Sequence, residues 1–383
     1  MFTKKELKDL EKDKLLRSPV VSMYLNTDKK TSDGQHYLAE LRRQLFLVNK
    51  KISTRYKKPI LFQNYLQEEI VPKILAFLDE EVLPHPDIRA IAIFASLSET
   101  LTKDNRRIVI YTLPQSVRSQ AHIEDTAFLR PLMFLLDQYE PYTVITVNRH
   151  IANFFLISLG EIHERKEFVS DIPRRHDQGG WSQKRFERKI ERAVEQHVQR
   201  VTKFATKRLR ETGARRIVLG GDDNMIHLLK KNLPERELKM VVGTVPSNPH
   251  ESAHETLERT LKVASEAERA SEQLAVQELR DALAHAGKAV SGIKETLNAI
   301  NNKKITKLIL HSDFHLDGSL CRNCQMLFAP TTQCPNCNLL TEHLDDLAEE
   351  IAERVFAEKG EVEFVMDNVD LEALGGIGAI LRY

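Results

Sequence analysis

The chain has 383 residues, of which 42% are hydrophobic and 29% charged, and its net charge at pH 7 is +1. This composition excludes wholesale disorder, and the length exceeds what one hydrophobic core organises, so two or three domains are expected. The near-neutral charge excludes a global field that attracts nucleic acid, so any such binding must come from local patches.

The hydrophobic pattern of residues 1–139 alternates between strand and helix. It predicts strands over Val20–Leu25, Ala90–Ala95 and Arg107–Tyr111, and helices over Tyr37–Ile52 and Leu61–Val82. The first segment is therefore expected to be an α/β domain.

Residues 140–270 repeat this alternation. The predicted strands are Thr143–Val147, Phe154–Leu159, Arg216–Gly221 and Lys239–Gly243, and the predicted helices are Ser182–Glu211 and His254–Ala286, the last of which borders the next linker. Residues 271–383 follow the same scheme. Here we expect helices over Ile293–Ile300 and Leu344–Ala357 and strands over Ile305–Leu310, Val362–Met366 and Leu374–Tyr383. The fold class is thus predicted as α/β with three domains.

All four cysteines lie in one short window, as Cys321-x2-Cys324-x9-Cys334-x2-Cys337. Each CxxC turn directs two thiolates to one point, and two such turns complete a tetrahedron around Zn²⁺. The clustering favours zinc in a reducing compartment over the alternatives of two disulfides or four unmetalled cysteines. Four protein ligands leave no open position for water, so the zinc is expected to be structural. His311 and His315, just upstream, are interpreted as surface histidines.

The N-terminus lacks an apolar signal segment, and no apolar run reaches the roughly 20 residues that cross a bilayer. We therefore expect a cytoplasmic protein with no membrane partner.

A glycine pair precedes the long helix of the second segment. Gly179 and Gly180 allow backbone conformations closed to other residues, and Ser182 is the expected N-cap. Cations on the helix, with Arg174 and Arg175, form a local basic stripe that suits phosphate contacts. The alternative is a solvated helix whose glutamates pair with these cations. The chain's only tryptophan, Trp181, favours the first interpretation, because an exposed indole stacks well on a base.

Three motifs here resemble the archaeal and eukaryotic class-1 release factor superfamily, which includes Pelota. Gly179–Arg188 looks like the family's Gly-Gly-Gln-Ser-x-x-Arg-Phe-x-Arg segment. Gly287–Leu297 is similar to the start of its third domain, and Gly375–Tyr383 to its C-terminal glycine-rich strand. The resemblance covers residues 140–383 by motif and residues 1–139 by architecture alone. It implies domains over 1–139, 140–270 and 271–383, with the cysteines in a zinc mini-domain inserted in the third.

The sequence departs from a working release factor at two points. Trp181 occupies the position of the family's hydrolytic glutamine, and neither Gln178 nor Gln183 lies in that slot. Indole has one N–H donor and no acceptor, so it cannot position water as a carboxamide does. The codon-reading Asn-Ile-Lys-Ser motif is also absent, with only a loose echo in Asn49–Ser53. We therefore predict no catalytic residue.

The resemblance to bacterial hibernation factors of the Balon type implies a role on idle ribosomes. The first domain would face the decoding centre, the middle domain the peptidyl transferase centre, and the third a protein partner, with elongation factor Tu as the implied candidate. The predicted partner is ribosomal RNA in the A site and not DNA. The predicted contacts are Arg174, Arg175, Gln178, Gly179, Gly180, Trp181, Ser182, Lys184, Arg185 and Arg188.

Two other functions stay open. The chain could be a peptidyl-tRNA hydrolase, a release factor or a rescue factor that uses Gln178 or Gln183 in a shifted loop, or a zinc-stapled RNA-binding protein that never engages ribosomes. His250-Glu251-Ser252-Ala253-His254 matches the HExxH metalloprotease pattern, but Pro249 places His250 at or before a helix start, so we interpret the match as chance. Asp222 and Asp223 are interpreted as capping or loop residues rather than catalytic ones.

Overall fold

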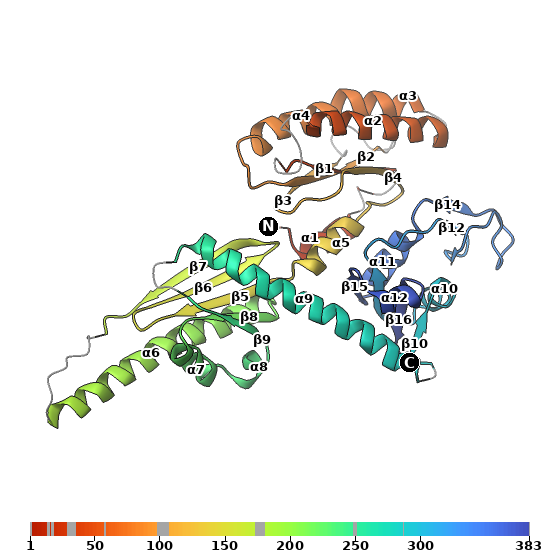
Figure 1. Ribbon diagram of the computed structural model, residues 1–383. Helices are drawn as coiled ribbons and strands as arrows, with labels where there is room; N and C mark the ends of the chain where they lie inside the picture. Colours follow the sequence, from red (N-terminus) through yellow and green to blue (C-terminus); the bar gives the residue numbers. More distant parts are fainter. Residues whose placement is uncertain are drawn as a thin grey trace. The chain divides into compact units, whose positions relative to one another are not determined.

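The computed structural model describes residues 2–13, 16, 19–28, 36–56, 59–97, 107–172, 181–247, 251–285 and 287–382, with the backbone alone at 36, 55 and 181–183. Its mixture of helices and sheets confirms the predicted α/β class (Figure 1). The fold divides into two compact units. Met1–Asp137 and Glu272–Tyr383 form the first unit, and Gln138–Ser271 form the second. The separation of the first unit into two domains stays a prediction. No helix in the described part of the chain is long and apolar enough to span a membrane.

The first segment contains one antiparallel sheet and the helices around it. Its elements are α1 (Lys4–Lys12), β1 (Val20–Asn26), α2 (His36–Arg55), α3 (Pro59–Tyr65), η2 (Leu66–Ile70), α4 (Val71–Phe77), η3 (Leu78–Val82), β2 (Ala90–Ser96), β3 (Ile108–Leu113), β4 (Gln120–Glu124) and α5 (Arg130–Gln138). The strands lie in the order β3-β2-β1-β4, and the predicted second helix is one helical stretch with two π-helical turns, η2 and η3.

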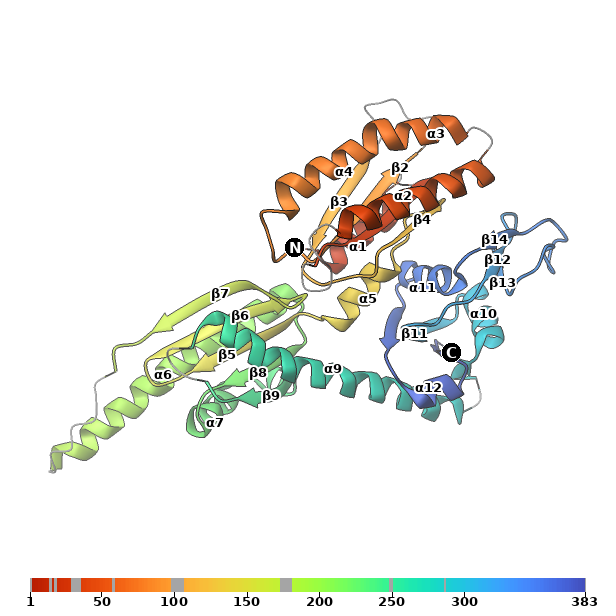
Figure 2. The ribbon, with the colours of Figure 1, turned by 45° about the horizontal axis from the view of Figure 1, so that its top comes forward.

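Helices α2 to α4 cover one face of this sheet (Figures 1 and 2). Val21, Met23 and Leu25 alternate along β1 and form one buried cluster with apolar residues of α2, α3 and α4. The intervening Tyr24 is also fully buried, and its hydroxyl donates a hydrogen bond to the Phe128 carbonyl oxygen at 2.6 Å. Burial on both faces explains why β1 has a continuous apolar sequence.

The second unit is built on a five-stranded mixed sheet. Its elements are β5 (Tyr142–Val147), β6 (Ile151–Ser158), β7 (Glu161–Val169), α6 (Trp181–Thr212), β8 (Arg216–Gly220), α7 (Asp223–Asn232), α8 (Glu235–Leu238), β9 (Val241–Val245) and the first part of α9 (Ala253–Leu283). The strand order is β7-β6-β5-β8-β9, with β8 parallel to both of its neighbours. Val198, Val201, Ala205 and Leu209 of α6 pack against β5, β6 and β8 in one buried cluster.

The last segment belongs to the first unit and contains a second sheet and a small third one. Its elements are β10 (Ala289–Ser291), α10 (Ile293–Asn301), β11 (Ile305–His311), β12 (Gly318–Leu320), β13 (Leu327–Phe328), β14 (Glu342–Leu344), α11 (Leu347–Ala357), β15 (Glu361–Val365), α12 (Val369–Ala373) and β16 (Ile377–Leu381). The larger sheet has the order β10-β16-β11-β15, and the smaller has the order β13-β12-β14. Predicted helix Leu344–Ala357 begins later, at Leu347, because Leu344 pairs with Gly318 in the small sheet.

Glycines in the C-terminal motif have two structural roles. Gly375 and Gly376 take φ angles of 89° and 74°, which residues other than glycine rarely adopt. At Gly378 an added Cβ would lie 2.6 Å from Leu279 of α9, so only glycine lets this helix approach β16 so closely.

Within the first unit, Glu349 of α11 connects the N-terminal and C-terminal segments. Its buried Oε1 accepts the backbone N–H groups of Leu129 and Arg130 at 2.7 and 2.8 Å, where α5 begins. At the other end of α5, Asp137 accepts the Phe364 N–H at 2.8 Å. Burial raises the pKa of Glu349 and also that of the neighbouring Glu353. Glu349 therefore caps α5 from a helix 220 residues away in sequence.

Two substitutions of Glu349 should distinguish the stability that comes from its hydrogen bonds to α5 from the effect of ionising its carboxyl group. Glu349→Ala leaves two N–H groups unpaired, so the free energy of unfolding at pH 7 should fall by about 2–4 kcal/mol. Glu349→Gln keeps an acceptor and should cost less than about 1 kcal/mol. The raised pKa of Glu349 contributes stability that is complete below the ordinary carboxyl pKa of about 4.3 and is lost as pH rises through the raised value. Denaturant midpoints from pH 4 to 9 should therefore change less in Glu349→Gln than in the wild type. Equal stability of the Ala and Gln variants would contradict the capping role.

Candidate functional site

The first turns of α6 present cations that make no ion pair with any described residue. Lys184, Arg185 and Arg188 are exposed, and no acid within the described residues pairs with them. Burial of this helix begins at Ile190. The helix starts at Trp181, so Ser182 lies in the first turn and is not the predicted N-cap. Of the other predicted contact residues, Arg174, Arg175, Gln178, Gly179 and Gly180 lie outside the described residues, and so do the side chains of Trp181 and Ser182.

The strand that leads into the glycine loop is fixed to α6 just before the loop. The Ser170 hydroxyl lies 2.8 Å from Nδ1 of His197 and accepts a hydrogen bond from Arg200 at 3.1 Å. Arg200 also donates to the carbonyl oxygen of Val169 at 2.8 Å. Burial lowers the pKa of His197, so the environment of the ring disfavours its charged form. The end of β7 is thus attached to the middle of α6.

These contacts divide the predicted basic stripe into two parts. Arg200 serves the attachment just described, and Arg208 is bound between Glu164 of β7 and Glu211. Both of these arginines stabilise the fold. The cations of the first turns have no such partners in the described structure, so they are available for a ligand.

The four predicted metal ligands converge on one point. The ligand atoms of Cys321, Cys324, Cys334 and Cys337 all lie within 4.8 Å of one another. The Sγ atoms of Cys321 and Cys337 are 3.4 Å apart, and those of Cys324 and Cys334 are 3.5 Å apart. Four Zn–S bonds of about 2.3 Å in a tetrahedron place sulfurs about 3.8 Å apart. All four cysteines are free thiols, so the geometry fits a metal ion and not disulfides.

The two CxxC turns have the same backbone design. The residue after each turn, Gln325 or Asn338, has a φ of 59°. Each donates its N–H to the carbonyl oxygen of the first cysteine of its turn, at 2.7 and 2.9 Å. His315 is exposed as expected, whereas His311 is largely buried and accepts the Asp313 N–H, which corrects its assignment as a surface residue. Neither histidine joins the cysteine cluster.

Two weaker motifs have structural explanations. The Asp222 side chain accepts the Met225 N–H at 2.9 Å and is the N-cap of α7, as predicted. Helix α9 begins at Ala253, and Ser252 and Glu255 exchange hydrogen bonds as a capping box at its start. His250 of the HExxH match precedes this helix and lies outside the described residues. Glu251 and Ser252 also precede the helix, so the described residues of the match do not lie on one helical turn as a protease site requires.

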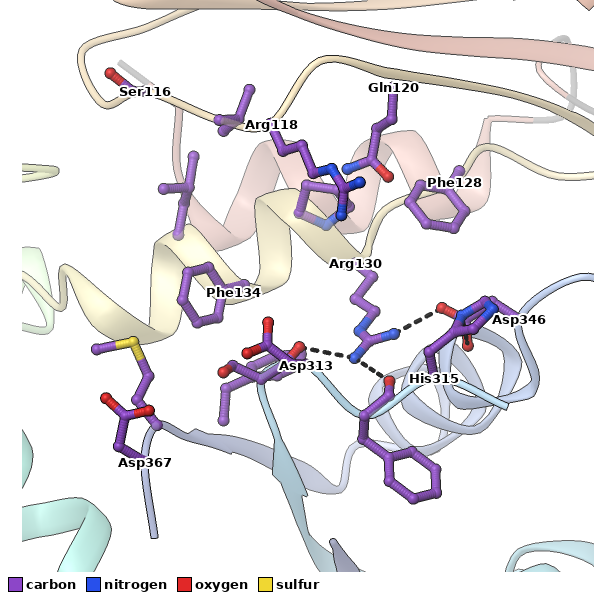
Figure 3. A pocket seen from close by; sticks show the side chains of 17 residues that line it. Ser116, Arg118, Gln120, Phe128, Arg130, Phe134, Asp313, His315, Asp346 and Asp367 are labelled. Carbon is purple, nitrogen blue, oxygen red and sulfur yellow. Dashed lines mark hydrogen bonds and ion pairs between the residues drawn. The ribbon is translucent and has the colours of Figure 1, made fainter. Parts of the chain in front are cut away.

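Arg130, which no sequence motif predicted, lies in a cavity of about 750 Å³ within the first unit (Figure 3). Its guanidinium donates to Asp346 at 2.6 Å and to the carbonyl oxygens of Ser312 and Phe314 at 3.0 and 2.6 Å. The Asp346 carboxylate neutralises Arg130, and the two carbonyl oxygens accept its remaining hydrogen bonds. Arg130 therefore joins α5 to the C-terminal segment. A single arginine before a proline gives no sequence signal for this role.

Family models match most of the second and third segments. Residues 128–265 match bacterial archaeo-eukaryotic release factor family 10, and residues 269–383 match eRF1 domain 3. The chain belongs to the bacterial branch of the release factor and Pelota superfamily. The predicted resemblance to this superfamily is confirmed, and the motifs at Gly179–Arg188, Gly287–Leu297 and Gly375–Tyr383 lie inside the matched ranges.

The relatives of this release-factor homologue include peptide chain release factors of archaea. Peptide chain release factor subunit 1 of Methanocaldococcus jannaschii is 26% identical, over 99% of this chain and 96% of the relative. The same factor from Thermococcus kodakarensis is 26% identical over 68% and 70% of the two chains. Among solved structures, archaeal termination factor aRF1 is 17% identical, with 100% and 99% coverage and a TM-score of 0.29. Archaeoglobus fulgidus Pelota is 15% identical, with 76% and 79% coverage and a TM-score of 0.34. The family assignment rests on the family models and the sequence relatives.

The cysteine cluster should bind one zinc ion per chain. We expect purified protein to contain zinc in a 1:1 ratio, measured by inductively coupled plasma mass spectrometry. Cys321→Ser should remove most of it and lower the melting temperature, because a structural metal contributes folding energy. The control is His315→Ala, which lies near the cluster in sequence and should keep its zinc. Full zinc occupancy in Cys321→Ser, or another metal in the wild type, would contradict this assignment.

Proposed function

We propose that this protein is a ribosome-binding translation factor that occupies the A site and does not cleave peptidyl-tRNA, as a hibernation factor does. Its membership of the release factor superfamily supports ribosome binding and a cytoplasmic location. Zinc in the cysteine cluster would staple the third domain. Elongation factor Tu is the candidate protein partner, from the resemblance to Balon-type factors.

The observation that carries this proposal is the residue at the start of α6. Trp181 is the first residue of this helix and directly follows Gly179 and Gly180. In the motif of release factors, that position holds the glutamine that helps water attack the peptidyl-tRNA ester. Indole cannot accept a hydrogen bond from water, so it fills this position without supporting hydrolysis.

The charge arrangement supports contact with RNA at the same end of the helix. Lys184, Arg185 and Arg188 are exposed, lie within two turns of Trp181 and have no acidic partners in the described structure. Phosphates provide favourable partners for such cations, and the contact does not depend on base sequence. The end of β7, which precedes this segment in sequence, is attached to the same helix through His197 and Arg200.

Charge reversal at the start of α6 should weaken ribosome binding. We expect Lys184→Glu/Arg185→Glu/Arg188→Glu to reduce cosedimentation with bacterial ribosomes by tenfold or more and to lessen its salt dependence. The matched control, Lys166→Glu/Lys230→Glu/Lys262→Glu, reverses three exposed lysines of the same unit and should bind as the wild type does. Ribosomes from starved or cold-treated cells are the appropriate substrate. No association of the wild type, or equal loss in both variants, would overturn the proposed contact.

Peptide release separates the hibernation proposal from the enzymatic alternative. On ribosomes loaded with labelled peptidyl-tRNA, the wild type should release no more peptide than buffer does, because residue 181 lacks a carboxamide. Gln178→Ala and Gln183→Ala should not change this result. Release by the wild type that either substitution abolishes would instead establish a hydrolase with a shifted glutamine.

A further inference from the structure

Helix α2 has one solvent face whose chemistry the fold does not use. Its inner side, including Leu41, Leu45, Val48 and Ile52, is buried against the first sheet (Figure 1). The exposed residues with described side chains are Ala39, Arg42, Arg43, Phe46, Leu47, Lys50, Ser53 and Thr54. Three of these are basic and none is acidic. The acid beside them, Glu40, lies mostly buried and pairs with Arg43 at 2.9 Å.

Phe46 lies at the centre of this face. Its side chain is 69% exposed, and its ring makes no aromatic or cation contact within the described structure. Arg42 precedes it by four residues and Lys50 follows it by four, so a cation lies about 6 Å along the helix axis on either side. Neither cation forms an ion pair among the described residues. An open aromatic face is thus flanked by two free positive charges.

A single exposed apolar residue needs no explanation, but this grouping does. Phe46 gains little stability from its exposed position, and neighbouring Leu47 is 40% exposed as well. A nucleobase can stack on a phenyl ring while the phosphates on either side of that nucleotide meet the two cations. We propose that the outer face of α2 binds single-stranded RNA, with Phe46 as the stacking platform and Arg42 and Lys50 as phosphate contacts.

An apolar patch on a protein partner is the rival occupant. Charge favours RNA, because no exposed residue of this face is acidic and Arg42 and Lys50 have no acidic partner among the described residues, although Arg43 pairs with Glu40. This inference rests on the proposed function in that ribosome binding brings RNA within reach of the first segment. It adds a surface on the first unit, separate in sequence from the glycine loop, and names stacking as the mode of contact.

The test measures binding of a fluorescein-labelled 12-nucleotide oligouridine to the full-length protein by fluorescence anisotropy. Phe46→Ala should weaken binding roughly 5- to 100-fold. Phe46→Trp should retain binding, and its indole fluorescence should be quenched by RNA in a Trp181→Phe background. Phe46→Leu should behave like Phe46→Ala, because leucine is apolar but cannot stack. The control is Leu274→Ala on α9, where the wild-type side chain is 70% exposed and which should leave affinity unchanged.

Arg42→Gln/Lys50→Gln should lower the slope of log affinity against log salt by about 1.4, since each phosphate contact with a single strand contributes about 0.7. Oligouridine affinity at the wild-type level in Phe46→Leu would show that the contact is merely apolar, and it would overturn RNA stacking. Ribosome cosedimentation of each variant, measured in parallel, separates the two proposals. If the wild type cosediments but Phe46→Ala does not weaken oligouridine binding, this inference fails and the proposed function stands. If oligouridine binding depends on Phe46 but ribosomes are ignored, the inference stands and the proposed function fails.

Discussion

Burial of one face of α6 against the middle sheet is the interaction on which the candidate site depends. The apolar residues Val198, Val201, Ala205 and Leu209 fix the helix on β5, β6 and β8, and this packing ends near Ile190. The first turns consequently carry no burden of core packing, and their exposed positions can hold cations without destabilising the fold. The same helix provides His197 and Arg200, which hold the end of β7. Helix α6 thus holds the end of β7, which precedes the glycine pair in sequence, and also presents the exposed cations that follow it.

The distribution of ion pairs shows how a nearly neutral protein can present local positive charge. Arg130, Arg208 and Arg216 each bind carboxylates inside the fold and therefore contribute nothing to an external field. Lys184, Arg185, Arg188, Arg42 and Lys50 are left without acids in the described structure. A net charge of +1 conceals this separation, because acidic residues elsewhere in the chain offset these cations in the sum.

The sequence predicted those elements whose signal is local and missed those whose stability comes from distant residues. Strands β1 and β2 were predictable because burial on both faces produces continuous apolar runs. Strand β7 was not, since its half-exposed sequence of charged residues resembles a surface loop, and it is held by pairing with β6. Helix α5 is capped by Glu349, whose position in sequence carries no information about residue 129.

The same distinction applies to the candidate sites. The four cysteines were found because the spacing of two tight turns is itself the geometry of the metal site. The cations of α6 were found as a group, but only the structure showed which of them are already bound. Arg208 illustrates the difficulty, because its partner Glu164 comes from strand β7. Arg188 has no acidic partner among the described residues, yet its sequence neighbourhood is similarly basic. The exposure of Phe46 could not be predicted from the sequence either. Helical periodicity predicts which face of α2 is buried, but it does not show whether another element covers an aromatic residue on the opposite face.

The cations at the start of α6 and those of the α2 face are each too few to bind RNA tightly alone. Three cations contact few phosphates, and each contact weakens as salt rises, so one patch alone binds RNA only loosely at physiological ionic strength. Two patches on one chain bind together far more tightly than either does alone when a single target presents both contacts at the right spacing, because the second contact becomes intramolecular. A large folded RNA offers many such pairs of sites, whereas a short single strand does not. The α2 face and the start of α6 lie on separate compact units, so simultaneous engagement would make this protein selective for an extended RNA surface such as that of a ribosome.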